Sequence, residues 1–580
     1  MIQITTLLCL LHTITIVVTV TSLEVKSYQS IGNVKYYPES DVETIASRPN
    51  TGISFSGGGS RAYISALGYL AGFHKLGLIS NIKYIIGVSG GSWATSVYSF
   101  HQNETLSDDE LLGAIISPKD IIYSDLSIMS KNCARSYTNV ETIHTRAMKG
   151  IAIDKTSSTK LNDDSDDVTF AMWSEAVQTT FLDPAGITRG IPFSYDSVSV
   201  EDIKKRNPQL NETDFLVVRK ESKIHGIASR PLPMMGTTLV GPTTDLPYTP
   251  TNRDYSILEI TPLSVGVLQS RVHTYGSTNH TIGGLIEPYA FGGEEAPVTG
   301  MSPDVGMEII EIPDLSQTIM DVNLATSSSS YYAGCLVAAG DKDIALNLSA
   351  IVPYFSPVVK NPVKDASKML LADGGGLQID NMISLLQRGV SNIILFSDTS
   401  VPLQPSSKWN PILDELSITH IDYDIPSFFG VIPIDLPSID EVYYDLTKSQ
   451  VFDSNDWIPL AISLQEAQSI GNGIIVKSIL KTIKNDYYGI NGNIDVNVTW
   501  VYTGRLSNWE IQLNEEMQEL VIPSTNTTDL SNTISNGPFT DFPNYPTLFS
   551  DINYERANLL ADISGWTILE NEKLFRDILK

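Results

Sequence analysis

The stretch TGISFSGGGSRAYISALGYLAGFHKLGLISNIKYIIGVSGGSWATSVYSF, residues 51–100, decides the fold of this chain. Its apolar runs at 53–55 and 84–86 each end in a glycine-rich loop and predict two strands. Residues 61–76 carry apolar side chains at helical spacing and on most other faces, which predicts a buried helix between these strands. We therefore expect the order strand, glycine loop, helix, strand, tight turn and second helix.

The tight turn carries a candidate nucleophile. Residues 87–91 read Gly-Val-Ser-Gly-Gly, a G-x-S-x-G motif placed between a predicted strand and a predicted helix. Glycines on both sides of the serine allow the sharp backbone turn that exposes its hydroxyl above the edge of a sheet. We predict that Ser89 is the nucleophile.

The upstream loop supplies the groups that such a serine needs next. Attack on an ester carbon places negative charge on the carbonyl oxygen, and backbone N–H groups stabilise that charge. Gly57, Gly58 and Gly59 lie where the chain enters a helix, so their amides and the positive end of the helix dipole are predicted to form an oxyanion hole. Arg61, in the first turn of that helix, is placed to bind an anionic group such as a phosphate.

A second informative stretch spans residues 369–396. It predicts a strand at 369–372, then Asp373, a glycine run, a helix at 381–388 and a further strand at 392–396. Such a unit would place Asp373 at the carboxyl end of a parallel strand, the edge at which α/β proteins build their sites. Ser89 is expected at the same edge, where the carboxylate could accept the serine proton and return it to a leaving alcohol.

Three motifs in this order carry a resemblance to a known family. SGGGSRA at 56–62, GVSGGSW at 87–93 and DGG at 373–375 resemble the catalytic-domain signature shared by phospholipase B (lysophospholipase) and cytosolic phospholipase A2. The GGSW ending is closer to the phospholipase B branch. Segments 258–262 and 325–329 are similar to less specific parts of that branch, and the likeness covers roughly residues 40 to 400.

The resemblance implies an α/β fold, a three-layer α/β/α domain with a mixed central sheet and large irregular insertions. It implies that Ser89 is acylated, that Asp373 is its only proton-transfer partner, and that Gly57, Gly58 and Gly59 form the oxyanion hole. Arg61 would steady the substrate phosphate or the tetrahedral intermediate. Phospholipids and lysophospholipids at membrane or micelle interfaces are the implied substrates, with no cofactor and no metal. The family's calcium-dependent C2 domain is absent here, so calcium targeting is not expected.

Length and charge set broad limits. The chain has 580 residues, is 42% hydrophobic and has a formal net charge of −28. Such an acidic protein is unsuited to nucleic acid and to electrostatic docking on anionic lipid. We interpret residues 23–580 as a single catalytic domain, with core motifs at 50–100 and 365–400 and an irregular insertion at 120–360 that forms the lid and acyl pocket.

The amino terminus and the sequons indicate the secretory route. Residues 1–22 lack charged side chains, are rich in Leu, Ile, Val and Thr, and end in small residues, which predicts a signal peptide; the missing basic region leaves an uncleaved anchor open. A secreted or lumenal protein, with a lysosomal or endomembrane location open, is therefore expected. Six N-x-[ST] sequons favour the same route, at Asn103, Asn211, Asn279, Asn347, Asn497 and Asn526.

The cysteines and the acidic run at 162–167 do not indicate a metal site or a definite disulfide. Cys133 and Cys335 are the cysteines beyond the leader, and they could be paired or could both be buried thiols. No cluster of Cys and His has metal-ligand spacing, so zinc is not expected. Residues 162–167 resemble part of a calcium loop but lack its glycine and terminal glutamate, and a solvated loop is the better interpretation.

Two rival functions remain open. An α/β-hydrolase with a Ser-Asp-His triad would use His420, which has the right chain order, although a surface loop residue is the better interpretation of that histidine. A non-catalytic lipid-binding protein on the same scaffold is the second rival. Residues 402–437 are rich in Pro and apolar residues, for which core packing is preferred to a rim of a lipid site, and residues 494–501 alternate as a strand.

Overall fold

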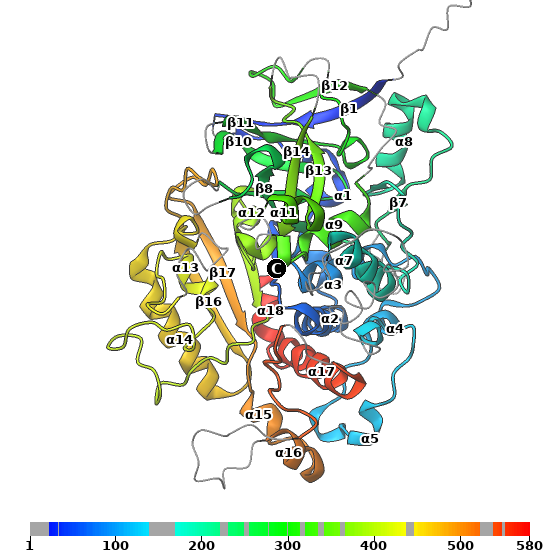
Figure 1. Cartoon of the computed structure of the whole chain (residues 1–580). Helices are drawn as coiled ribbons and strands as arrows, with labels where there is room; N and C mark the ends of the chain where they lie inside the picture. Colours follow the sequence, from blue (N-terminus) through cyan, green and yellow to red (C-terminus); the bar gives the residue numbers. More distant parts are fainter. Residues whose placement is uncertain are drawn as a thin grey trace, which may run out of the picture.

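A computed structural model describes the chain over most of its length (Figure 1). The described residues are 22–32, 34–138, 169–220, 230–248, 254–275, 278–297, 300–313, 320–334, 342–359, 366–436, 446–522, 537–547 and 552–580. The predicted leader, the acidic run at 162–167, Cys335 and Asn526 lie outside these ranges.

A long mixed sheet forms the centre of the molecule. Its middle strands, from β8 to β17, run parallel to one another, whereas the strands on both flanks pair antiparallel. This confirms the predicted α/β class with a mixed central sheet. The strand order is β12 (Met307–Pro313), β1 (Ser22–Tyr28), β11 (Thr278–Ile286), β10 (Val265–Tyr275), β9 (Ser256–Ile260), β8 (Leu232–Pro242), β5 (Tyr84–Gly87), β4 (Thr51–Phe55), β15 (Asn392–Ser397), β17 (Asp495–Tyr502) and β16 (Ile474–Lys481).

Helices cover both faces of the parallel region, because successive side chains of a strand point to opposite faces. On one face, Phe55 of β4 and Phe396 of β15 lie with ring centroids 5.2 Å apart, and Tyr69 of α2 (Gly59–Leu76) lies 4.3 Å from Phe396. On the other face, Gly52 of β4 packs against Leu385 of α12 (Met382–Gln387). The α/β/α layering follows from this alternation.

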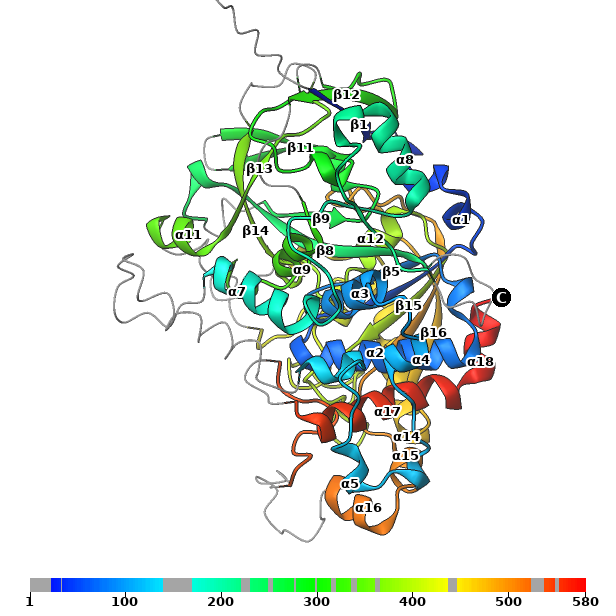
Figure 2. The same cartoon turned by 90° about the vertical axis from the view of Figure 1, so that its right-hand side faces the viewer.

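Helix α2 is packed on its outer side by α17 (Tyr554–Glu570), which runs beside it across the molecule (Figure 2). Two glycines of α2 allow this close approach: a Cβ at Gly68 would lie 2.4 Å from the carbonyl oxygen of Ala561, and one at Gly72 would lie 2.7 Å from Ile568. Helix α2 is buried along almost its whole length, as its apolar faces predicted.

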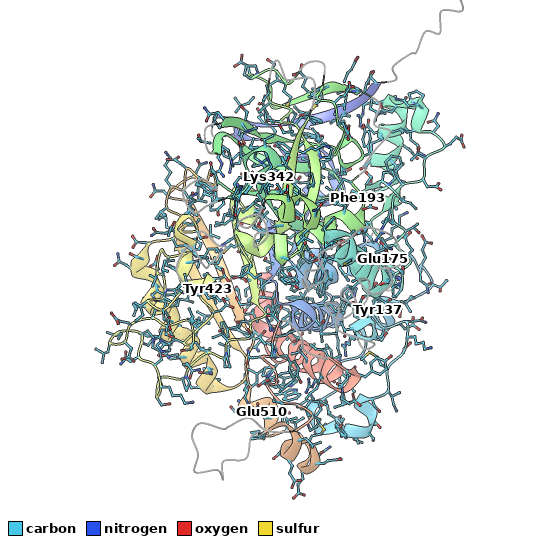
Figure 3. All side chains as sticks on the ribbon, in the orientation of Figure 1. Tyr137, Glu175, Phe193, Lys342, Tyr423 and Glu510 are labelled. Atoms are coloured by element: carbon cyan, nitrogen blue, oxygen red, sulfur yellow. The ribbon has the colours of Figure 1, made fainter. Side chains whose placement is uncertain are left out.

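The remaining elements complete the two helical layers and the periphery. Glu175 of α7 and Tyr423, next to α13, lie on opposite flanks of the molecule (Figure 3). The other described helices are α1 (Glu43–Ala46), α3 (Gly90–Phe100), α4 (Asp108–Leu112), α5 (Tyr123–Leu126), α7 (Phe170–Val177), α8 (Ser197–Arg206), α9 (Val322–Ser329), α11 (Lys342–Leu348), α13 (Asp424–Ser427), α14 (Trp457–Ile470), α15 (Ser507–Glu510), α16 (Glu515–Val521) and α18 (Glu572–Ile578). The other strands are β2 (Ser30–Ile31), β3 (Val34–Lys35), β6 (Phe193–Ser194), β7 (Leu216–Val217), β13 (Ala350–Tyr354) and β14 (Ser367–Asp373).

The segment 120–360 is more regular than the sequence predicted, because it supplies β8 to β13 of the main sheet. Strand β8 reads LPMMGTTLVGP and is buried at every position. A strand buried on both faces lacks the polar–apolar alternation that marks a half-exposed strand, so its sequence gives a weak signal. The segment 23–49 likewise contains a full strand of this sheet, β1, and the short strand β3.

The later part of the chain agrees with the sequence. Strand β17 matches the alternating run at 494–501. Phe428 and Phe429 are fully buried, and Phe429 packs between Trp457 and Trp500 with ring centroids 6.0 Å from each, so this apolar run belongs to the core. Among the helices of the described residues, none combines the length and the apolar character that crossing a membrane would need.

A buried ion triad fixes the far end of α12. The guanidinium of Arg388 lies 2.9 Å from a carboxylate oxygen of Glu39 and 2.6 Å from one of Glu259, and all three side chains are almost completely buried. The cation also lies 4.4 Å from the ring centroid of Tyr37. The triad therefore joins the amino-terminal segment, strand β9 and the helix that follows Asp373.

Replacing Arg388 by Met is expected to lower the free energy of unfolding by about 3–5 kcal/mol, because two carboxylates would remain buried without their cation. Chemical denaturation measures this loss. The matched control is Arg576→Met, which removes an exposed ion pair with Glu572 and should change stability little. Equal effects of the two substitutions would contradict a structural role for the triad.

Candidate active site

The lengths of three strands bring Ser89 and Asp373 together. Strand β8 has 11 residues and β5 only 4, so β5 covers just the first half of the β8 edge and ends with Gly87 opposite Met235. Strand β14 fills the second half of the same edge from the opposite direction and ends with Asp373 opposite Thr237. The two strands therefore meet carboxyl end to carboxyl end, on either side of Gly236.

The predicted direction of the strand that ends at Asp373 was wrong. Strand β14 does not run parallel to β15; it pairs antiparallel with both β8 and β13, whereas β15 lies between β4 and β17. The physical reason is the open half-edge of β8, whose unpaired backbone groups are satisfied by an incoming strand of either direction. The carboxyl end of β14 still reaches the carboxyl end of β5.

The hydroxyl of Ser89 lies near the carboxyl group of Asp373. Each is only 8% exposed. The Oδ1 atom of Asp373 also accepts the backbone N–H of Gly375 at 2.8 Å. Burial raises the pKa of Asp373 to about 6, and the Gly375 amide and the Ser89 hydroxyl limit that rise. The structure thus places a hydroxyl beside a carboxyl group that is more basic than an ordinary aspartate.

The backbone of Ser89 is held in an unusual conformation. Its φ is 51° and its ψ is −121°, so it lies in the left-handed half of the map, where residues with a side chain are rare. Its carbonyl accepts the N–H of Ser92 at 2.9 Å as α3 begins. The next residue, Gly90, has no room for a side chain, because a Cβ there would lie 2.1 Å from the carbonyl oxygen of Gly59. The turn and the glycine loop are therefore in direct contact.

The glycine loop offers two amides, one fewer than predicted. The N–H of Gly57 donates to the carbonyl oxygen of Ile379 at 3.0 Å and is not available for a substrate. Gly58 and Gly59 both have positive φ, 136° and 61°, and within the described ranges neither amide has an acceptor. The loop lies against the candidate nucleophile, since a Cβ at Gly57 would be 3.0 Å from that of Ser89. The candidate oxyanion hole is thus reduced to Gly58 and Gly59.

Arg61 is buried against the protein itself. Its guanidinium donates to the carbonyl oxygens of Asp398 and Tyr545 and to the hydroxyl of Thr547, and a Cβ at Gly58 would lie against it. Burial lowers the pKa of Arg61 to about 10, so the side chain remains charged at neutral pH. The structure therefore shows Arg61 bracing the glycine loop against the carboxyl-terminal segment. Direct contact with a phosphate stays a prediction, and it would require the guanidinium to exchange one of these acceptors.

Several buried carboxyl groups lie in the region of Arg61. Asp398 follows β15, and burial raises its pKa to about 7. Asp380 and Asp424 are also buried, and burial together with the neighbouring Asp422 raises the pKa of both. In the portion of the chain that the structure describes, no three His, Cys, Asp or Glu side chains are arranged to bind a metal ion.

Two other residues from the sequence are structural. Trp93 stacks on Phe181 with ring centroids 4.6 Å apart, which is core packing behind the turn. His420 stacks on Trp409 at 5.0 Å, and its Nδ1 accepts the N–H of Ser417. Among the described residues, the His420 ring contacts neither Ser89 nor Asp373, so the geometry does not favour a Ser-Asp-His triad.

Sequence reasoning missed a third element of the site. The backbone N–H of Ser89 donates to the carbonyl oxygen of Ser329, 3.1 Å away, and that of Asp373 donates to the carbonyl oxygen of Tyr331 at 3.0 Å. Residues 325–329 carried a weak resemblance to the phospholipase B branch, and this resemblance was the available signal.

The sequons differ in their settings. Asn103, Asn211, Asn279 and Asn347 are exposed. Asn497 lies in the parallel strand β17, and its side-chain amide donates to the Asn392 side chain at 2.9 Å, which makes it unsuited to carrying a glycan. Cys133 is a buried free thiol whose pKa is raised by burial.

Comparison with known proteins gives local sequence matches. The chain is 44% identical to mouse cytosolic phospholipase A2 gamma over 57 residues, which are 10% of each protein. It is 28% identical to lysophospholipase 2 of Candida albicans over 154 residues, 23% of this chain and 25% of that protein. The chain thus matches a quarter or less of the length of either relative.

The other comparisons add little. No family model matches the chain. The solved structure of human GIVD cytosolic phospholipase A2 aligns with 93% of this chain and 65% of its own, at a TM-score of 0.42 and 12% identity.

The prediction of a secreted or lumenal protein is wrong. The mouse gamma, zeta and delta relatives are all named cytosolic phospholipases A2, which contradicts the secretory route inferred from the apolar leader and the sequons. Apolar amino termini and N-x-[ST] triplets also arise by chance in a chain rich in Ile, Asn and Thr, so neither pattern is specific to secretion.

The matched relatives carry the names of the families that the motifs around Ser89 and Asp373 resemble. The predicted resemblance is thereby confirmed: the sequence relatives of this chain are members of the cytosolic phospholipase A2 family and a lysophospholipase.

Proposed function

We propose that this protein hydrolyses the carboxylic ester bonds of glycerophospholipids and lysophospholipids, through an acyl intermediate on Ser89 with Asp373 as its only proton-transfer partner. The observation that carries the proposal is the proximity of a strained serine and a buried carboxyl group, beside two loop amides that have no acceptor among the described residues. The names of the sequence relatives support a phospholipid as substrate, and the relatives named cytosolic phospholipases A2 favour the cytosol as the working compartment.

The first half of the reaction acylates the enzyme. The ionised carboxylate of Asp373 accepts the proton of the Ser89 hydroxyl as its oxygen attacks the ester carbon. The carbonyl oxygen of the ester becomes negatively charged and receives hydrogen bonds from the amides of Gly58 and Gly59. When the tetrahedral intermediate breaks down, Asp373 gives its proton to the departing alcohol, and the acyl group remains on Ser89.

The second half restores the enzyme by the same groups. A water molecule takes the place of the departed alcohol, and Asp373 accepts its proton as the water oxygen attacks the acyl-serine carbon. Breakdown of this intermediate releases the fatty acid, and the proton returns from Asp373 to Ser89. A single carboxyl group can act as base and then as acid, because its raised pKa of about 6 lies close to neutral pH.

A direct test uses one defined diacyl phospholipid and its lyso form, with products identified by mass spectrometry. The wild-type protein should release fatty acid, and Ser89→Ala and Asp373→Asn should each lower turnover at least about a thousandfold, because the dyad acts as a unit. His420→Ala is the matched control and should keep most of the activity. A fluorophosphonate should label Ser89; an unlabelled serine would indicate a lipid-binding protein instead.

The pH dependence follows from Asp373. Only the ionised carboxylate can accept the serine proton, so the rate of fluorophosphonate labelling should rise as the pH increases through about 6 and fall as Asp373 is protonated below it. Labelling from pH 4 to 8 measures this limb. A rate independent of pH over the range would exclude Asp373 as the base.

Arg61→Lys separates the two roles of this arginine. A lysine cannot reach the acceptors on Asp398, Tyr545 and Thr547 together, so the glycine loop should loosen and turnover should fall about tenfold or more. If Arg61 only braces the loop, a phospholipid and an uncharged short-chain ester lose the same factor. Loss confined to the phospholipid would instead establish the phosphate contact. Arg505→Lys, which changes a half-exposed pair with Glu510, is the control.

A further inference from the structure

The carboxyl-terminal end of α9 and the residues just after it contact the backbone of both Ser89 and Asp373. Helix α9 spans Val322–Ser329 and is fixed at its start by Asp321, whose side chain accepts the N–H of Leu324 at 2.6 Å. Thr326, in its middle, is hydrogen-bonded to Ser96 of α3 at 2.7 Å. The helix is thus attached to the same α3 that begins at the nucleophile turn.

The last carbonyls of a helix have no partner within it and must find donors elsewhere. Here the carbonyl of Ser329 accepts the N–H of Ser89 at 3.1 Å, and the carbonyl of Tyr331, just past the helix end, accepts the N–H of Asp373 at 3.0 Å. One turn of three residues therefore receives the backbone amides of both members of the candidate dyad, although these lie 284 positions apart in the sequence.

Ser329 adds its side chain to this arrangement. Its Oγ lies 3.3 Å from the backbone nitrogen of Ser89 and accepts the same N–H, while its hydroxyl donates to the carbonyl oxygen of Gly236 at 2.6 Å. Gly236 is the β8 residue between the ends of β5 and β14. Ser329 is fully buried, so water does not compete for these bonds. The hydroxyl consequently links the strained turn to the strand that sets the position of Asp373.

We propose that Ser329 is a positioning residue that fixes the backbone of Ser89 relative to Asp373, through the hydroxyl bridge from the Ser89 amide to Gly236. This role rests on the proposed function, because it matters only if Ser89 is the nucleophile. Ser329 does not touch the substrate. It keeps the serine oxygen within reach of the carboxylate, where a small displacement would slow proton transfer and attack together.

The test compares Ser329→Ala with Ser328→Ala, its neighbour in the same helix. The Ser328 hydroxyl contacts Ala325 and Thr237 and does not reach Ser89. Both serines are fully buried, so both substitutions should lower the melting temperature similarly. The readouts are the rate constant of fluorophosphonate labelling, kcat and KM on one lysophospholipid, and the pH dependence of labelling.

For Ser329→Ala we expect labelling and kcat to fall about tenfold, the change that one lost hydrogen bond produces, with KM unchanged. The acid limb should stay near pH 6, because the contacts of the Asp373 carboxylate are unaltered. Ser328→Ala should slow labelling less than twofold. Since an alanine in this core could prevent folding, Ser329→Cys and Ser328→Cys repeat the comparison with side-chain volume nearly conserved and hydrogen bonding weakened.

Two results would overturn the proposal. Labelling of the Ser329 variants at the wild-type rate would show that the hydroxyl bridge does not position the nucleophile. Equal slowing by the Ser328 variants would show that any loosening of α9 has the same effect. Failure of the wild-type protein itself to be labelled is distinguishable from both, because it would remove the proposed function and the positioning role with it.

Discussion

The structure depends on a mismatch in length between two neighbouring strands. Because β8 continues well beyond the end of β5, it presents an open row of backbone groups, and β14 satisfies them from the opposite direction. The carboxyl ends of β5 and β14, where the candidate catalytic side chains lie, are thereby brought against one another. The proximity of the Ser89 hydroxyl to the Asp373 carboxyl group is a consequence of this pairing.

Close backbone approach is the second constraint on the site. Gly90 packs on the carbonyl of Gly59, and a Cβ at Gly374 would lie 2.4 Å from the carbonyl of Gly236. Such spacing leaves no room for side chains between the nucleophile turn, the glycine loop and the loop after Asp373. The three backbones are therefore closely packed, and such packing suits a proposed catalytic group whose geometry must be fixed before the substrate arrives.

Burial accounts for the electrostatics of the site. Asp373 is buried, so its proton affinity rises, and the Gly375 amide and the Ser89 hydroxyl limit that rise. Arg61 is not among the groups that shift the pKa of Asp373, and its guanidinium is directed at the carbonyls of Asp398 and Tyr545. The positive charge of Arg61 is thus not directed at Asp373, the candidate base. This arrangement suits a mechanism in which one carboxyl group gains and loses a proton twice in each turnover.

The sequence by itself determined the local features. The strand–loop–helix units around 51–100, the nucleophile turn at Ser89 and the identity of Asp373 depend on apolar periodicity and glycine placement over a few residues, and these patterns are visible in the chain. The tertiary structure decided the direction of β14, the hydrogen bond from the Gly57 amide to Ile379 and the internal contacts of Arg61. It also decided the backbone hydrogen bonds that Ser89 and Asp373 donate to Ser329 and Tyr331. Each of these is a pairing between segments far apart in sequence, set by which backbone donors and acceptors the fold leaves open, and no local pattern records that choice.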